Sequence, residues 1–146
     1  MAVVWMNPCP YTSVDLSMEK SFDGFMKKNK ILVIDDDPEV LAFREVLLRS
    51  EGYEVFSLEG GDQLMYEMER IQPNLVITDI MMPGLTGGAV YEILRQNFEE
   101  NIPVIVSSVS KIKIRGKGDP YLAYVSKEED ADIMLSTINR LLNSGE

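Results

Sequence analysis

From Lys30 onward, short apolar runs of strand length alternate with longer segments of helical period. The apolar runs lie at residues 31–34, 53–57, 75–78, 103–107 and 122–125. The helical segments lie at residues 38–50, 62–70, 87–98 and 128–142. Strongly apolar strands that alternate with helices form a parallel sheet covered on both faces. The pattern therefore predicts an α/β fold, a doubly wound five-stranded parallel sheet.

Local signals support these helix assignments. Asp37 can cap the first helix and Pro38 suits its first turn. Gly52 stands where that helix is expected to stop, and Thr86 can cap the third helix. The apolar residues of segment 38–50 that can share one face are Val40, Phe43, Leu47 and Leu48.

Composition excludes several kinds of site. The chain has 146 residues, which predicts one domain, and a net charge of -10, which disfavours direct nucleic acid binding because an acidic surface repels phosphates. It has no histidine and one cysteine, Cys9, so a Cys/His nucleophile, a histidine metal site and an intramolecular disulfide are excluded. No apolar run is long enough to span a membrane or to form a signal core. We therefore expect a cytoplasmic protein without membrane insertion.

Residues 1–29 differ in composition from the rest and are expected to be a flexible extension, in which residues 18–28 can form a short amphipathic helix. Met18 and Met26 are alternative starts, so the extension is either native or an artefact of the assigned gene start. We expect residues 30–143 to form the single domain, with no output domain after it.

Polar side chains follow four of the strands at their carboxyl ends. They are Asp35, Asp36 and Asp37 after the first strand, Asp79 after the third, Ser107 and Ser108 after the fourth, and Ser126 and Lys127 after the fifth. Doubly wound sheets bind ligands at this edge. Crowded carboxylates destabilise a fold unless a cation compensates them, and Mg²⁺ prefers oxygen ligands. This placement predicts Mg²⁺ binding by Asp35, Asp36 and Asp79, whereas Asp37 is expected to cap its helix.

A carboxylate in such a site can form an acyl phosphate. Phosphoryl transfer depends mainly on positioning and on neutralisation of charge. The Lys127 ammonium can pair with phosphoryl oxygens, and the Ser108 hydroxyl can donate a further contact.

Four segments, taken in order, resemble the receiver domains of two-component response regulators. They are ILVIDDDPEV at 31–40, LVITDIMMPGLTGG at 75–88, PVIVSS at 103–108 and YVSK at 124–127. The resemblance runs from about Lys30 to Leu142. It implies the flavodoxin-like receiver fold, with strand order 2-1-3-4-5.

The resemblance also implies roles by position. Asp79 would be the phosphoacceptor, Asp36 would ligate Mg²⁺ directly, Asp35 would act through water, and the Met81 carbonyl would supply another oxygen. The residues that would respond to the phosphoryl group are Lys127, which binds it, Ser108, which swings toward it, and Tyr124, which changes rotamer.

The resemblance implies a function in phosphorelay signal transduction, and the protein is not expected to be an enzyme. The donor would be a histidine kinase or a histidine phosphotransfer protein. The protein would catalyse its own phosphotransfer and autodephosphorylation. As a stand-alone response regulator it would signal by binding a downstream protein or by passing the phosphoryl group on.

Three departures from the family pattern stand out. Glu128 follows Lys127 where the family usually has proline, so the bond between them is expected to be trans. Val109 is expected to modulate access to Asp79 and hence reaction rates, as is Met81. Segment 110–120 stands where the family has its fourth helix, and it is expected to form a degenerate helix of at most one turn. The segment is either a solvated basic loop or a surface that binds an acidic partner.

Other functions remain open on the residues alone. A pseudo-receiver would bind a partner without being phosphorylated. A phosphatase of the haloacid dehalogenase type would use Asp35 and Asp37 as its D-x-D motif, although no later acidic pair fits. A nucleotide-binding module would need a glycine-rich loop after the first strand, which the chain lacks.

Overall fold

The computed structural model describes residues 28–98, 102–109 and 118–143. Its elements, in order, are β2 (Lys30–Ile34), α2 (Pro38–Ser50), β3 (Glu54–Leu58), α3 (Leu64–Ile71), β4 (Leu75–Asp79), α4 (Gly87–Asn97), β5 (Val104–Ser108), β6 (Leu122–Ser126) and α5 (Ala131–Asn143). The helix expected at 18–28 and nearly all of the extension 1–29 lie outside the described residues. So does most of the irregular segment, residues 110–117.

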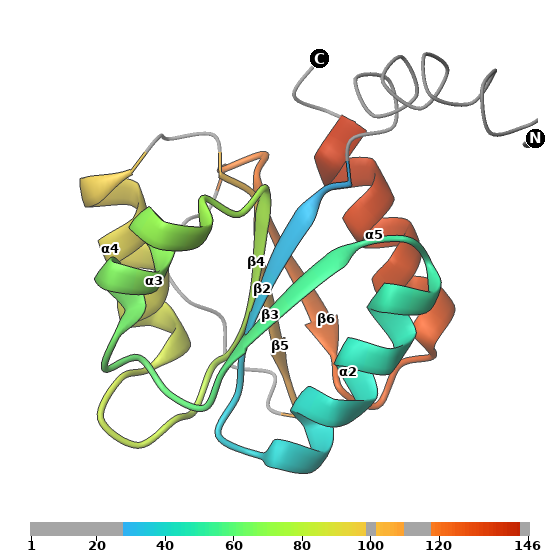
Figure 1. Cartoon of the computed structure of the whole chain (residues 1–146), viewed down its shortest axis with the longest axis horizontal. Helices are drawn as coiled ribbons and strands as arrows, with labels where there is room; N and C mark the ends of the chain where they lie inside the picture. The colour runs from blue at the N-terminus through green and yellow to red at the C-terminus, as the bar shows by residue number, and fades with distance from the viewer. Residues whose placement is uncertain (1–27, 99–101, 110–117, 144–146) are drawn as a thin grey trace, which may run out of the picture.

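The strands form one parallel sheet in the order β3-β2-β4-β5-β6. In chain order this is 2-1-3-4-5, so the predicted fold class is confirmed. Helices α2 and α5 cover one face of the sheet, and α3 and α4 cover the other (Figure 1). The order reverses between β2 and β4, so the carboxyl ends of these two strands form the switch point.

The core has two layers because side chains of a strand point alternately to opposite faces. In β2, Ile31 and Val33 pack in the layer under α2 and α5, whereas Leu32 and Ile34 pack in the other. In β4, Ile77 belongs to the α2–α5 layer. Asp35 and Asp79 follow Val33 and Ile77 by two positions, which places them on the α2–α5 side of the sheet.

Helix α2 begins as its sequence predicts. The Asp37 side chain accepts a hydrogen bond from the Glu39 N–H at 2.9 Å, and Gly52 after the helix has φ 92°. The predicted apolar face is wrong in part, because Phe43 is 63% exposed. Leu48 is buried as predicted, but the other buried residues of the helix are Leu41 and Arg44, which the prediction did not include.

Helix α5 begins at Ala131, three residues later than predicted. The main-chain N–H of Glu128 donates to Ser126 Oγ and that of Glu129 to Ser126 O. The amides after Lys127 are thus used in a turn around Ser126. The described residues contain no cis peptide, so the Lys127–Glu128 bond is trans as predicted.

A polar cluster centred on Asp119 joins α4 to the start of β6. Asp119 Oδ2 accepts hydrogen bonds from Tyr91 Oη at 2.6 Å and Arg95 Nε at 2.9 Å, and Asp119 Oδ1 accepts one from the Tyr121 N–H at 2.8 Å. Burial opposes ionisation of Asp119, but these hydrogen bonds and the charge of Arg95 outweigh it and lower its pKa. The ionised carboxylate therefore stabilises the folded chain.

The Asp119→Asn variant is expected to be less stable than the wild type at pH 7 by about 1.5 kcal/mol, the low end for hydrogen bonds to a charged group because the cluster is partly exposed. A depressed pKa stabilises above the unfolded value and ceases to do so as pH falls through the folded value. The difference should thus shrink below pH 3.8, the ordinary value for Asp119. Urea unfolding across this range measures it, with Glu69→Gln, an exposed carboxylate on α3, as control. A gap that persists at low pH would contradict the charge argument.

Candidate functional site

Three carboxylates meet at the switch point of the sheet. Asp35 follows β2, Asp36 is the next residue, and Asp79 ends β4, and one oxygen from each lies within 4.8 Å of the others. Asp35 is 1% exposed, Asp79 is 7% exposed and Asp36 is exposed. The Asp37 N–H donates to Asp35 Oδ1 at 2.9 Å, which holds that carboxylate toward the cluster. The structure thus brings together the three acids that the sequence placed at two strand ends.

Lys127, in the turn after β6, reaches this cluster. Its Nζ lies 2.7 Å from Asp35 Oδ2 and 3.1 Å from Asp79 Oδ2. Its main-chain N–H donates to the Ser108 carbonyl at 3.2 Å, which extends the contact between β5 and β6 by one residue. Burial opposes the charge, but contacts with both carboxylates outweigh it and raise the pKa of Lys127.

The donor set fits a hard divalent cation. Asp35 Oδ2 is buried and accepts no hydrogen bond of regular geometry from the described residues, although the Lys127 ammonium forms an ion pair with it. A buried carboxylate oxygen with spare acceptor capacity, beside two more carboxylates, matches the oxygen ligands that Mg²⁺ prefers. The fit to Mg²⁺ is judged from the protein's own oxygen atoms.

The loop after β4 is held close to Asp79. The Met81 N–H lies 3.4 Å from Asp79 Oδ1, and the Gly87 N–H donates to the Ile80 carbonyl at 2.9 Å. A Cβ at Gly87 would lie 2.4 Å from the Asp79 carbonyl oxygen, so a side chain there would push the loop away. Met81 is 61% exposed beside the acids.

The other predicted residues surround the same edge. Ser108 is buried at the end of β5, and Val109 after it is 68% exposed. Tyr124 lies on the edge strand β6 and is 37% exposed. Their roles in switching and in access to Asp79 stay predictions.

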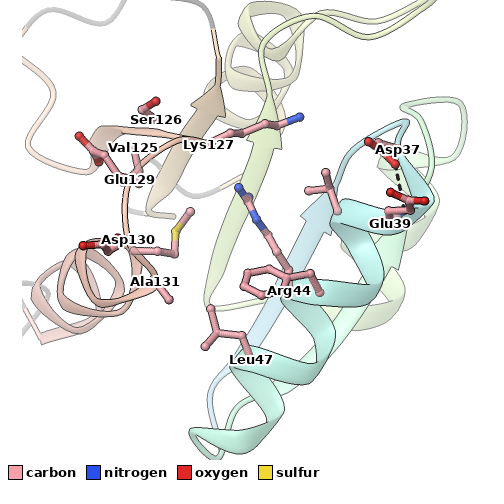
Figure 2. A pocket seen from close by; sticks show the side chains of 13 residues that line it. Asp37, Glu39, Arg44, Leu47, Val125, Ser126, Lys127, Glu129, Asp130 and Ala131 are labelled. Carbon is pink, nitrogen blue, oxygen red and sulfur yellow. Dashed lines mark hydrogen bonds between the residues drawn. The ribbon is translucent and has the colours of Figure 1, made fainter.

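Arg44 is the charged residue near the site that the sequence analysis missed. It is 7% exposed, and its Nη2 donates to Ser107 Oγ at 2.6 Å. Burial lowers the pKa of Arg44, whereas the charges of Asp35 and Asp79 raise it in part. Arg44 and Lys127 both line a cavity of about 330 Å³ between α2 and α5 (Figure 2). The sequence signal that could have identified Arg44 as buried is its position three residues after Leu41 and four before Leu48, which places all three on one helix face.

Comparison with known proteins places this geometry in a family. Residues 31–139 match the model of the response regulator receiver domain. The chain belongs to the response regulator receiver family. Receiver domains are phosphoacceptors that bind Mg²⁺ at an acidic pocket and interact with histidine kinases and downstream partners.

Curated relatives of this receiver domain differ in length. It is 35% identical over 136 residues to a protein named probable transcriptional regulator ycf27 of Porphyridium aerugineum, covering 82% of this chain and 56% of that one. It is 31% identical over 117 residues to protein PilH of Pseudomonas aeruginosa, covering 77% and 97%. The chain thus spans about half the length of the first relative and nearly all of the second.

Solved structures share the fold of this receiver domain. The chemotaxis protein CheY4 of Vibrio cholerae superposes with a TM-score of 0.70 at 21% identity, covering 78% of this chain and 98% of that one. The response regulator TrrA of Thermotoga maritima, solved in complex with Mg²⁺-BeF, superposes with a TM-score of 0.69 at 26% identity, covering 77% of this chain and 98% of that one.

Among the described residues, no helix has the length and apolar character to cross a membrane.

Membership of the receiver family excludes one of the alternative functions and leaves another open. A phosphatase of the haloacid dehalogenase type would need Asp35 and Asp37 to act together as its D-x-D motif. In the structure Asp37 is exposed and caps α2. The haloacid dehalogenase interpretation is therefore wrong. A pseudo-receiver has the same fold, so this alternative has to be tested by chemistry.

Proposed function

We propose that the protein is a stand-alone response regulator receiver that accepts a phosphoryl group on Asp79, in a Mg²⁺-dependent reaction. One observation carries this proposal: Asp79 lies at the end of the central strand β4, with two further carboxylates within 4.8 Å and the Lys127 ammonium at 3.1 Å. The donor would be a histidine kinase or a histidine phosphotransfer protein. Residues 30–143 would form the receiver, as the match of residues 31–139 to the family model supports.

The chain's own groups suffice for the transfer once cation and donor are in place. An Asp79 oxygen bonds to phosphorus while the bond from phosphorus to the donor nitrogen breaks, and the electron pair leaves with the donor. Lys127 would pair with phosphoryl oxygens, and Ser108 would donate a hydrogen bond to them. Mg²⁺, held by Asp35, Asp36, Asp79 and the Met81 carbonyl, would supply positive charge against the same oxygens.

The signal would leave through the strands beside the site. Ser108 would move toward the phosphoryl group and Tyr124 would change rotamer, so that phosphorylation biases the surface near β5 and β6. Tyr124 is partly exposed on the edge strand, where such a change reaches the surface. A downstream protein partner, or a further phosphotransfer protein, would respond to this state.

Intact mass spectrometry after incubation with acetyl phosphate tests the proposal. We expect one phosphoryl adduct with Mg²⁺ and none when EDTA replaces Mg²⁺, because the acids repel the anionic donor without a cation. No adduct, with Mg²⁺ binding shown separately, would favour the pseudo-receiver.

The same assay on Val109→Ala tests whether the Val109 side chain limits access to Asp79. We expect this variant to be phosphorylated faster than the wild type. Unchanged rates would show that Val109 does not limit access.

A further inference from the structure

Arg44 is a buried cation that the phosphotransfer mechanism above does not use. It is 7% exposed, and one hydrogen bond, to Ser107 Oγ, is described for its guanidinium. A buried charge destabilises a fold unless it is paired, and an apolar residue of similar volume usually packs as well or better. An arginine on the sheet-facing side of α2 therefore needs compensation from opposite charge nearby.

The acids of the site supply that compensation. Asp79 on β4 is in register with Ser107 on β5, and paired positions of neighbouring strands place their side chains on the same face of the sheet. The hydroxyl that Arg44 holds thus lies next to Asp79, on the α2–α5 side. Burial lowers the pKa of Arg44, and the charges of Asp35 and Asp79 raise it in part, so both carboxylates act on its guanidinium. Figure 2 shows Arg44 extending from α2 toward the end of the sheet where Lys127 lies.

This placement changes the charge of the site before any cation binds. The site holds three carboxylates. Lys127 forms ion pairs with Asp35 and Asp79, and the charge of the buried Arg44 acts on the same two carboxylates. With Arg44 counted, the site carries one net negative charge instead of two. Because Arg44 is held inside the protein, its field on the site is screened by solvent far less than that of a surface arginine.

We propose that Arg44 is a positioning residue of the site, which acts through Asp35 and Asp79 as a fixed counter-charge and weakens their binding of divalent cations. The inference rests on the proposed Mg²⁺ site. It implies that the unphosphorylated acid cluster is partly neutralised by the chain itself. A cation then binds less tightly than it would to the same three carboxylates without Arg44.

Titration calorimetry with Mg²⁺ tests the inference on the full chain. We expect Arg44→Gln, which keeps a hydrogen-bond donor for Ser107 but loses the charge, to tighten Mg²⁺ binding roughly tenfold, equal to about 1.4 kcal/mol. Arg44→Lys should bind Mg²⁺ like the wild type. Arg49→Gln is the matched control because it removes the same charge from an exposed position on α2, and it should also bind like the wild type.

A gain in affinity cannot result from misfolding, since an unfolded site binds more weakly. If Arg44→Gln does not fold, as judged by circular dichroism, Arg44→Met is measured in its place. Wild-type affinity or weaker binding in a folded neutral variant would overturn the role of Arg44 and leave the Mg²⁺ site standing. So would tightening by Arg44→Lys to the level of Arg44→Gln. If neither wild type nor variants bind Mg²⁺, both this inference and the proposed Mg²⁺ site fail.

Discussion

Asp79→Asn is expected to abolish the phosphoryl adduct completely. A neutral amide oxygen is too weak a nucleophile to form the acyl phosphate, and the variant also loses one of the three carboxylates that would hold Mg²⁺. The fold should persist, because Lys127 keeps its ion pair with Asp35 and the carboxylate repulsion is reduced. Intact mass after treatment with acetyl phosphate and Mg²⁺ measures the loss, and circular dichroism checks the fold.

Asp37→Asn provides a matched control for that experiment. It removes one negative charge two residues from Asp35, and an asparagine can still cap α2. This variant should be phosphorylated like the wild type. If Asp79→Asn still gains the adduct, the acceptor is another residue and the assignment of Asp79 is wrong.

Lys127→Met is expected to slow phosphorylation of Asp79 by a factor of about 10²–10³, the usual effect of removing one preorganised group that stabilises developing charge. The Lys127 ammonium is the described cation that contacts both Asp35 and Asp79, at 2.7 and 3.1 Å. Without it, phosphoryl oxygens would lose a positively charged partner and both carboxylates would lose their ion pair. The rate of adduct formation, followed by quenched mass spectrometry at saturating Mg²⁺, measures the effect.

Lys127→Arg separates charge from shape in the same assay. Arginine keeps the charge but has a larger, planar head group, so we expect a rate between those of the wild type and Lys127→Met. Saturating Mg²⁺ removes any difference in cation affinity from the comparison. A wild-type rate in Lys127→Met would show that Lys127 has only a structural role.

Much of the fold could be predicted because its signals are local. The apolar runs are long enough to be buried strands, and the caps Asp37 and Thr86 accept hydrogen bonds from Glu39 and Ala89 as predicted. The meeting of the acids also follows from the sequence once the sheet is known to be parallel, because consecutive parallel strands end at one edge.

Tertiary packing decided which face of α2 is buried and at which residue α5 begins, and the sequence alone did not predict either of them fully. In α2 the spacing of apolar residues is compatible with two neighbouring faces, and the sheet buries the one with Leu41, Arg44 and Leu48. Phe43 is left in solvent as a result. Helix α5 starts late because the amides after Lys127 are used by Ser126, a contact that local propensity does not report.

The sequence by itself determined the layered α/β fold, the strand ends that carry chemistry, and the candidate phosphoacceptor Asp79. Only the tertiary structure decided that Arg44 on α2 and Lys127 after β6 both interact with Asp35 and Asp79. The physical reason is that residue type and period set which elements form and which way strands run. The distance between charges on different elements is set by how helices pack on the sheet, and this distance governs their interaction energy.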